Sequence, residues 1–159
     1  MEEKRNKACQ ILDALREIEL LVAELYRRFA RLFSEDRELW EGLSREEEGH
    51  AALATELKSM MGTDVVSASL SKVHLAALDT YKKGLEYQLG RLERGEIGRK
   101  NALFIARDLE KTLVERMYYD LIRNDDPDSR TIRARIQSET GTHLDKLEKY
   151  IGKVTADLR

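Results

Sequence analysis

The stretch that decides the fold is residues 39–61, which read LWEGLSREEEGHAALATELKSMM. Its apolar residues recur at the three- and four-residue intervals of a helix that turns one face toward a core. In the middle of that face the leucines give way to Glu46, Glu47 and His50. Glu47 and His50 lie about one helical turn apart and point the same way. Because an unpaired charge in a core is strongly destabilising, this pattern predicts partners from elsewhere in the chain.

The composition of the whole chain favours a single all-α domain. Its 159 residues are enough for one domain with its own core, and only 1 of them is Pro and 9 are Gly. Charged residues make up 36% of the chain and aromatic residues 6%, which is typical of long helices with salt-bridged outer faces. We therefore expect one helical domain over residues 1–159.

Charge and cysteine content exclude several classes of function. With 28 basic and 30 acidic residues the net charge is -2, so the chain lacks the basic field of a nucleic-acid-binding protein. The single cysteine, Cys9, excludes an internal disulfide and a metal site built from several thiolates. The sequence shows neither a signal peptide nor a membrane-spanning apolar run, so we expect a cytoplasmic protein.

Helical periodicity covers most of the sequence and predicts five helices. The expected spans are residues 4–33, 36–61, 67–93, 99–123 and 128–154. A very short link joins the first two helices, so they should pack as an antiparallel hairpin. The loop around Pro127 should join the last two as a second hairpin. The helix over residues 67–93 has no carboxylate cleanly on its apolar face and is expected to be a crossover between the hairpins.

The two hairpins carry the same kinds of polar residue on their apolar faces. Each supplies a glutamate from its first helix and an acid–histidine pair from its second. These residues are Glu19, Glu47 and His50 in the first hairpin and Glu110, Glu139 and His143 in the second. The similar spacing indicates an internal repeat over about 9–61 and 100–154. Packed together, the hairpins would bring all these side chains to one level of a four-helix bundle.

A box of carboxylates and imidazoles of this kind suits two divalent metal ions. Hard or borderline ions accept carboxylate oxygen and imidazole nitrogen, and a glutamate is long enough to bridge two of them. The ions would also offset the buried negative charge. We expect two divalent cations at Glu19, Glu47, His50, Glu110, Glu139 and His143, and these ligand types alone do not distinguish iron, manganese and zinc.

One part of this pattern has a family resemblance. Ile18-Glu19, with Tyr26 seven residues after the glutamate, followed by Glu47-Glu48-Gly49-His50, resembles the first half of rubrerythrins and of the wider ferritin-like superfamily. The resemblance is close over residues 11–61 and looser over 100–154. It implies an all-α, ferritin-like antiparallel four-helix bundle with an additional crossover helix and a di-iron or di-manganese centre.

In those families each half of the bundle contributes one glutamate and a Glu-x-x-His pair. Carried over by position, the resemblance makes Glu19, Glu47, His50, Glu110 and His143 ligands. It also places the side chain of Tyr26 beside the site.

The second half of the chain departs from the family pattern. Three residues before His143 stands Thr140, and the acid is Glu139, one residue earlier. Glu139 can serve as the substitute ligand because a four-residue spacing keeps it on the same helical face as His143. Thr140, beside the site, could equally weaken one metal position. No Cys-x-x-Cys pair is present, so a rubredoxin domain is absent and electrons would come from a separate donor.

Three functions are open on the sequence alone. The resemblance implies a rubrerythrin-like oxidoreductase that acts on peroxide, O2 or ferrous iron. A second possibility is a metal-free bundle in which Glu47 and Glu139 lie at solvated edges and the histidines are hydrogen-bonded in the core. The apolar faces would then provide enough surface for a homodimer, which we expect as the oligomeric state. The third is iron handling by a ferritin-like subunit.

Overall fold

The computed structural model describes residues 2–59, 75–113 and 127–157. Within these ranges the protein is all-α, with five α-helices, one short 3₁₀ turn and no strand, as the sequence predicts. The helices are α1 (Glu2–Leu32), α2 (Arg37–Ser59), α4 (Leu75–Glu93), α5 (Arg99–Thr112) and α6 (Pro127–Asp157), and the 3₁₀ turn η1 (Ser34–Asp36) precedes α2. None of these helices is long and apolar enough to cross a membrane.

Helix boundaries follow the apolar periodicity wherever a helix end lies within the described residues. α1 ends one residue before its predicted end and α2 begins one residue after its predicted start, while α4 ends and α5 begins at the predicted residues. Three predicted stretches, 60–61, 67–74 and 114–123, lie outside the described residues. Periodicity therefore located the helices well, because each one buries a continuous apolar face.

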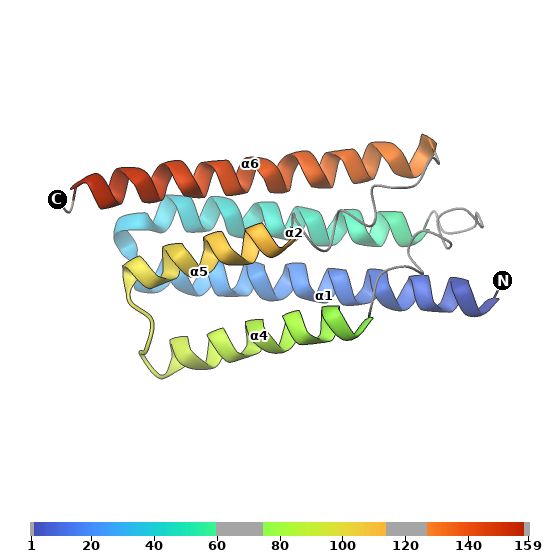
Figure 1. Ribbon diagram of the computed structural model, residues 1–159, viewed down its shortest axis with the longest axis horizontal. Helices are drawn as coiled ribbons and strands as arrows, with labels where there is room; N and C mark the ends of the chain where they lie inside the picture. The colour runs from blue at the N-terminus through green and yellow to red at the C-terminus, as the bar shows by residue number, and fades with distance from the viewer. Residues whose placement is uncertain (1, 60–74, 114–126, 158–159) are drawn as a thin grey trace.

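α1 and α2 lie side by side and run in opposite directions, which confirms the predicted antiparallel hairpin (Figure 1). α6 lies along α2, α4 lies along α1, and α5 packs against α6. The two termini lie at opposite ends of the long axis (Figure 1). The centre of the molecule is thus enclosed by helices that are far apart in the sequence.

The core follows the predicted apolar face of α1 over most of its length. The buried members of this face, each at most 3% exposed, are Ile11, Leu12, Leu15, Ile18, Val22, Leu25 and Phe29. Burying one such side chain contributes about 1.5–3 kcal/mol, so α1 provides much of the stability. On α4 the buried residues are Leu78, Leu85 and Leu92, which recur at heptad spacing and so lie on one face of the helix.

An ion pair between the buried Asp36 and the partly exposed Arg99 joins three elements at one end of the molecule. Asp36 of η1 is 1% exposed, and its carboxylate accepts hydrogen bonds from Arg99 of α5 at 2.7 and 2.8 Å. The hydroxyl of Tyr150 on α6 donates a further hydrogen bond to it at 2.5 Å. Burial alone would raise the pKa of Asp36, but Arg99 and Tyr150 hold it below its ordinary value. This contact ties α5 and α6 to the α1–α2 turn.

Candidate metal centre

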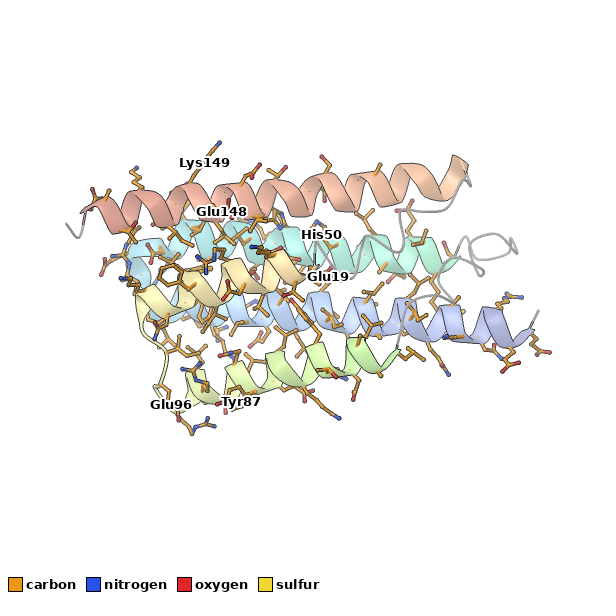
Figure 2. All side chains as sticks on the ribbon, in the orientation of Figure 1. Glu19, His50, Tyr87, Glu96, Glu148 and Lys149 are labelled. Carbon is orange, nitrogen blue, oxygen red and sulfur yellow. The ribbon has the colours of Figure 1, made fainter. Side chains whose placement is uncertain are left out.

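Four helices bring polar side chains to one buried region near the middle of the molecule. Figure 2 shows Glu19 of α1 and His50 of α2 close together there. The buried residues of this cluster, none more than 2% exposed, are Glu19, Glu47, His50, Glu110 and His143. Each lies within an apolar helical face, so burial of its leucine, isoleucine or alanine neighbours carries it into the interior.

Glu47 lies between the two histidines. Its Oε2 atom is 3.1 Å from Nδ1 of His50, and its Oε1 atom is 2.9 Å from Nδ1 of His143. The two imidazole rings stack with their centroids 5.1 Å apart. A single carboxylate from α2 therefore faces the inner nitrogen of both histidines.

Glu19 and Glu110 lie on either side of this arrangement. Glu19 Oε2 is 3.9 Å from Nδ1 of His50, and Glu110 Oε2 is 4.0 Å from Nδ1 of His143. Glu110 Oε1 accepts a hydrogen bond from the hydroxyl of Tyr26 at 2.7 Å. Its Oε2 is buried and has no hydrogen-bond partner among the described residues. Each inner histidine nitrogen thus faces the shared Glu47 and one further buried carboxylate.

The outer nitrogens of the histidines face carboxylates on the opposite helix. Nε2 of His50, on α2, is 3.0 Å from Oε2 of Glu139 on α6. Nε2 of His143, on α6, is 2.7 Å from Oε2 of Glu46 on α2. The Glu46 and Glu139 side chains are 41% and 43% exposed, so they connect the buried imidazoles to solvent.

The cluster contains every predicted metal ligand, but Glu139 differs from the other five in position. It lies at the outer nitrogen of a histidine and is partly exposed, whereas the other five are buried. The metal-free alternative placed Glu47 and Glu139 at solvated edges; this is wrong for Glu47, which is fully buried, whereas Glu139 is partly exposed. The backbone of residue 140 is helical, but the side chain of Thr140 lies outside the described ones.

Glu46 contacts His143 of the cluster, although the sequence pattern placed it only on the apolar face and not among the predicted ligands. A usable signal was present, because Glu46 precedes His50 by four residues just as Glu139 precedes His143. The acid that matches Glu139 is therefore Glu46, and not Glu47. Glu47 then corresponds to position 140 on α6.

Burial dominates the electrostatics of the cluster. Burial and repulsion from Glu47 raise the pKa values of Glu19 and Glu110 well above the ordinary carboxyl value. Burial also raises the pKa of Glu47 and lowers that of His143. In the absence of a cation the acids therefore tend to hold protons, while the His143 imidazole tends to be neutral. Such a cluster can exchange protons for a cation.

Two tyrosines flank the carboxylates, Tyr26 fully buried and Tyr81 partly buried. Tyr26 of α1 donates its hydrogen bond to Glu110, and its ring lies 5.5 Å from that of Trp40. Tyr81 of α4 donates to the backbone carbonyl of Leu109, next to Glu110, at 3.1 Å. Burial and the neighbouring glutamates raise the pKa values of both phenols, so both remain protonated at neutral pH. Tyr26 lies beside the site, where the family resemblance placed it, whereas Tyr81 was not among the predicted residues.

The cluster has the donor atoms and spacing of a metal-binding site. Donor atoms of Glu47, His50 and His143 all lie within 4.8 Å of one another. Two atoms bound to the same ion are about 3.0–3.5 Å apart when each bond is about 2.0–2.2 Å long. The 2.9 and 3.1 Å separations around Glu47 are hydrogen-bond distances that lie close to the short end of that range. This buried group could bind a metal ion.

Comparison with known proteins adds no family to this description. No family model, curated protein or solved structure matches the chain. The interpretation of the site therefore depends on its geometry and on the chemistry of its side chains.

Proposed function

We propose that this chain binds two divalent metal ions in a ferritin-like bundle and uses them as a non-haem oxidoreductase. The position of Glu47 carries the proposal, because its two oxygens face two different histidines. One donor set would be Glu19, His50 and Glu47 Oε2. The other would be Glu110, His143 and Glu47 Oε1. Glu47 would bridge the two ions.

The balance of buried charge supports two cations. Three buried glutamates carry raised pKa values because desolvation disfavours their charged forms. Divalent cations would replace the protons and compensate the carboxylates directly. Oxygen and nitrogen donors without thiolates suit iron or manganese, and zinc also accepts them.

Glu46 and Glu139 have a different role in this proposal. A carboxylate at Nε2 of an imidazole favours the tautomer that carries its proton there, which leaves Nδ1 free to bind a cation. Glu139 stands at Nε2 of His50, and Glu46 stands at Nε2 of His143. Both residues would orient ligands, so Glu139 would not itself be a ligand.

The helix arrangement is compatible with the ferritin-like part of the proposal. The proposed ligands come from α1, α2, α5 and α6, which would be the four bundle helices. α4 contributes no ligand, lies along α1, and would be the additional crossover helix. The bundle keeps bulk water from the centre, since every proposed ligand is at most 2% exposed.

Bound iron would supply electrons for the reduction of peroxide or O2. The residues of this chain would bind the ions, exclude water and hold protons nearby. The hydroxyl of Tyr26 donates its proton in a hydrogen bond to Glu110 Oε1, with 2.7 Å between the two oxygens, and so holds a proton within the site. A separate electron donor would be needed to return the centre to its reduced state.

Metal content and metal titration test this function. Wild-type protein should bind about two Fe(II), Mn(II) or Co(II) ions per chain, because it offers two donor sets. Glu47→Gln should lose most of this binding, because an amide is a poor bridging ligand. Glu48→Gln is the matched control, since Glu48 is an exposed neighbour that pairs with Arg27. The Fe(II) protein should change its visible absorption when peroxide is added.

Each outcome separates one alternative. Absence of metal binding, or equal binding by wild type and Glu47→Gln, would contradict the proposed centre and favour a metal-free bundle. Metal binding without a change in visible absorption on addition of peroxide would contradict the proposed oxidoreductase activity but not the metal site. A closed multi-subunit shell in size-exclusion chromatography would favour iron storage.

A further inference from the structure

A cavity between α2 and α6 lies outside the proposed metal centre. α6 lies along α2 and runs in the opposite direction (Figure 1). Between the two helices, next to η1, is a solvent-open cavity of about 460 Å³, a volume typical of sites for small molecules. None of the residues that line it is a proposed metal ligand. The cavity is therefore a second candidate site.

The end of the cavity nearer the metal centre is basic. Its lining residues there are Arg45 of α2 and Lys146 of α6. Nζ of Lys146 lies 3.4 Å from Glu46, and Arg45 has no hydrogen bond or ion pair with any described residue. A guanidinium has five N–H donors and an ammonium has three, so both side chains can still bind an anion.

The opposite end of the cavity is acidic. Glu35 and Asp36 of η1 and Glu38 of α2 line it. Asp36 is paired with Arg99, which also pairs with Glu35 at 2.7 Å. Glu38 forms no hydrogen bond or ion pair within the part of the chain that the structure describes. Three carboxylates thus share one paired cation, which leaves a surplus of negative charge at this end.

The part of the cavity between the two ends is largely apolar. Leu39 of α2 and Tyr150 of α6 line it, together with Gly42. A Cβ atom added at Gly42 would have no atom within 4 Å, so the glycine leaves open space between the two ends. Glu38 and Arg45, seven residues apart, lie on the same face of α2 and are separated by about 10 Å along its axis.

We infer that this cavity binds a linear molecule that has an ammonium group at one end and a carboxylate at the other. The ammonium would pair with Glu35 and Glu38, and the carboxylate would pair with Arg45 and Lys146. A chain of about four to six carbon atoms would lie over Gly42, because the long side chains at each end shorten the 10 Å separation. An α-amino acid carries both charges on one carbon atom and cannot reach both ends.

Isothermal titration calorimetry on the full-length chain tests the inference, with 6-aminohexanoate as the probe. Wild type should bind one molecule per chain. Hexanoate and hexylamine each provide only one of the two charges, so each should bind at least about fivefold more weakly, because linking two groups adds their contributions. Glycine should show no comparable binding.

Filling the cavity should abolish this binding. Gly42→Leu places a side chain in the open space and should fold, because leucine is a better helix former than glycine and nothing lies within 4 Å of the added Cβ. Gly84→Leu is the matched control. Gly84 is an exposed glycine on α4 with the same free space, and it lies outside the cavity lining.

Charge variants test the orientation of the probe. Arg45→Gln should weaken binding of 6-aminohexanoate about fivefold and leave binding of hexylamine unchanged, because only the carboxylate end loses a partner. Glu38→Gln should weaken 6-aminohexanoate and hexylamine alike and leave hexanoate unchanged. Both side chains are exposed, so neither variant should alter the circular dichroism spectrum.

The outcomes separate this inference from the proposed metal function. Glu47→Gln, which should lose metal, should bind 6-aminohexanoate as wild type does. Absence of binding by wild type would overturn the inference, as would equal binding by wild type and Gly42→Leu. Hexanoate or hexylamine binding as tightly as 6-aminohexanoate would also overturn it, because the ligand would then need only one charge.

Discussion

Glu110 shows how one carboxyl group links the centre to protein stability. It is fully buried, and its pKa is raised well above 4.5 by burial and by the nearby Glu47. Such a group stabilises the fold while it is protonated in both states. That contribution is present below the unfolded-state pKa and is lost as the pH rises through the folded-state pKa.

Glu110→Gln should therefore change how stability depends on pH. The amide can still accept the Tyr26 hydrogen bond but cannot ionise. Without metal, the variant should gain stability relative to wild type as the pH rises from about 4 to about 8. Urea denaturation across this range measures the difference. Glu48→Gln, at an exposed position, should show no such trend, and parallel curves for wild type and Glu110→Gln would contradict the interpretation.

At the scale of elements, Asp36 holds η1, α5 and α6 together. The carboxylate is 1% exposed, and its partners Arg99 and Tyr150 lie far along the chain. Glu110 lies on α5 and His143 lies on α6, so the positions of these two helices determine where the two side chains lie in the cluster. The Asp36 contact at one end of the molecule is thus connected to the polar cluster through α5 and α6.

Asp36→Ala should lower the free energy of unfolding by about 1.5–3 kcal/mol, because it removes the hydrogen bonds that the buried carboxylate accepts from Arg99 and Tyr150. It should also weaken metal binding by allowing α5 and α6 to shift. Chemical denaturation and Co(II) titration measure the two effects. Glu96→Ala is the control, because it removes only surface contacts with Arg91 and Arg94. It should leave the free energy of unfolding and the affinity for Co(II) unchanged. A variant Asp36→Ala as stable as wild type would show that the contact has no such role.

At the scale of the whole molecule, metal binding should be visible as thermal stabilisation. A ligand that binds only the folded state adds about 2.7 kcal/mol at a concentration 100 times its Kd. For a chain of this size each kcal/mol raises Tm by roughly 2–4 °C, so saturation should raise it by about 5–10 °C. Differential scanning calorimetry with Mn(II) measures the shift, which a chelator should reverse. Glu47→Gln should show little of it, and an equal shift in that variant would mean that the ions bind elsewhere.

The all-α fold follows from local sequence patterns. The apolar residues of α1 between Ile11 and Phe29 recur at helical intervals, so they share one face of the helix, and that face is buried. Glu19, Glu47 and Glu110 interrupt such faces, and all three are buried as their positions predict. The sequence predicts which residues of a helix share a face, because the direction of each side chain is set by its position along that helix.

The sequence pattern did not predict which side chains contact one another across different helices. Glu46 and Glu47 are neighbours in sequence and lie about 100° apart on α2, both near the edge of its apolar face. Only the packing of α6 against α2 determines that Glu47 faces the inner nitrogens of both histidines while Glu46 faces an outer one. Tyr81 was likewise indistinguishable from a core residue until α4 placed it beside α5.

The sequence by itself determined the helices, the antiparallel α1–α2 hairpin and the presence of acids and histidines on buried faces. Each of these depends on periodicity, or on a link too short for another arrangement. The tertiary structure decided which carboxylate meets which nitrogen and how η1, α5 and α6 join at Asp36. Those contacts depend on the rotation and relative height of whole helices, which the packing of many apolar side chains sets at once.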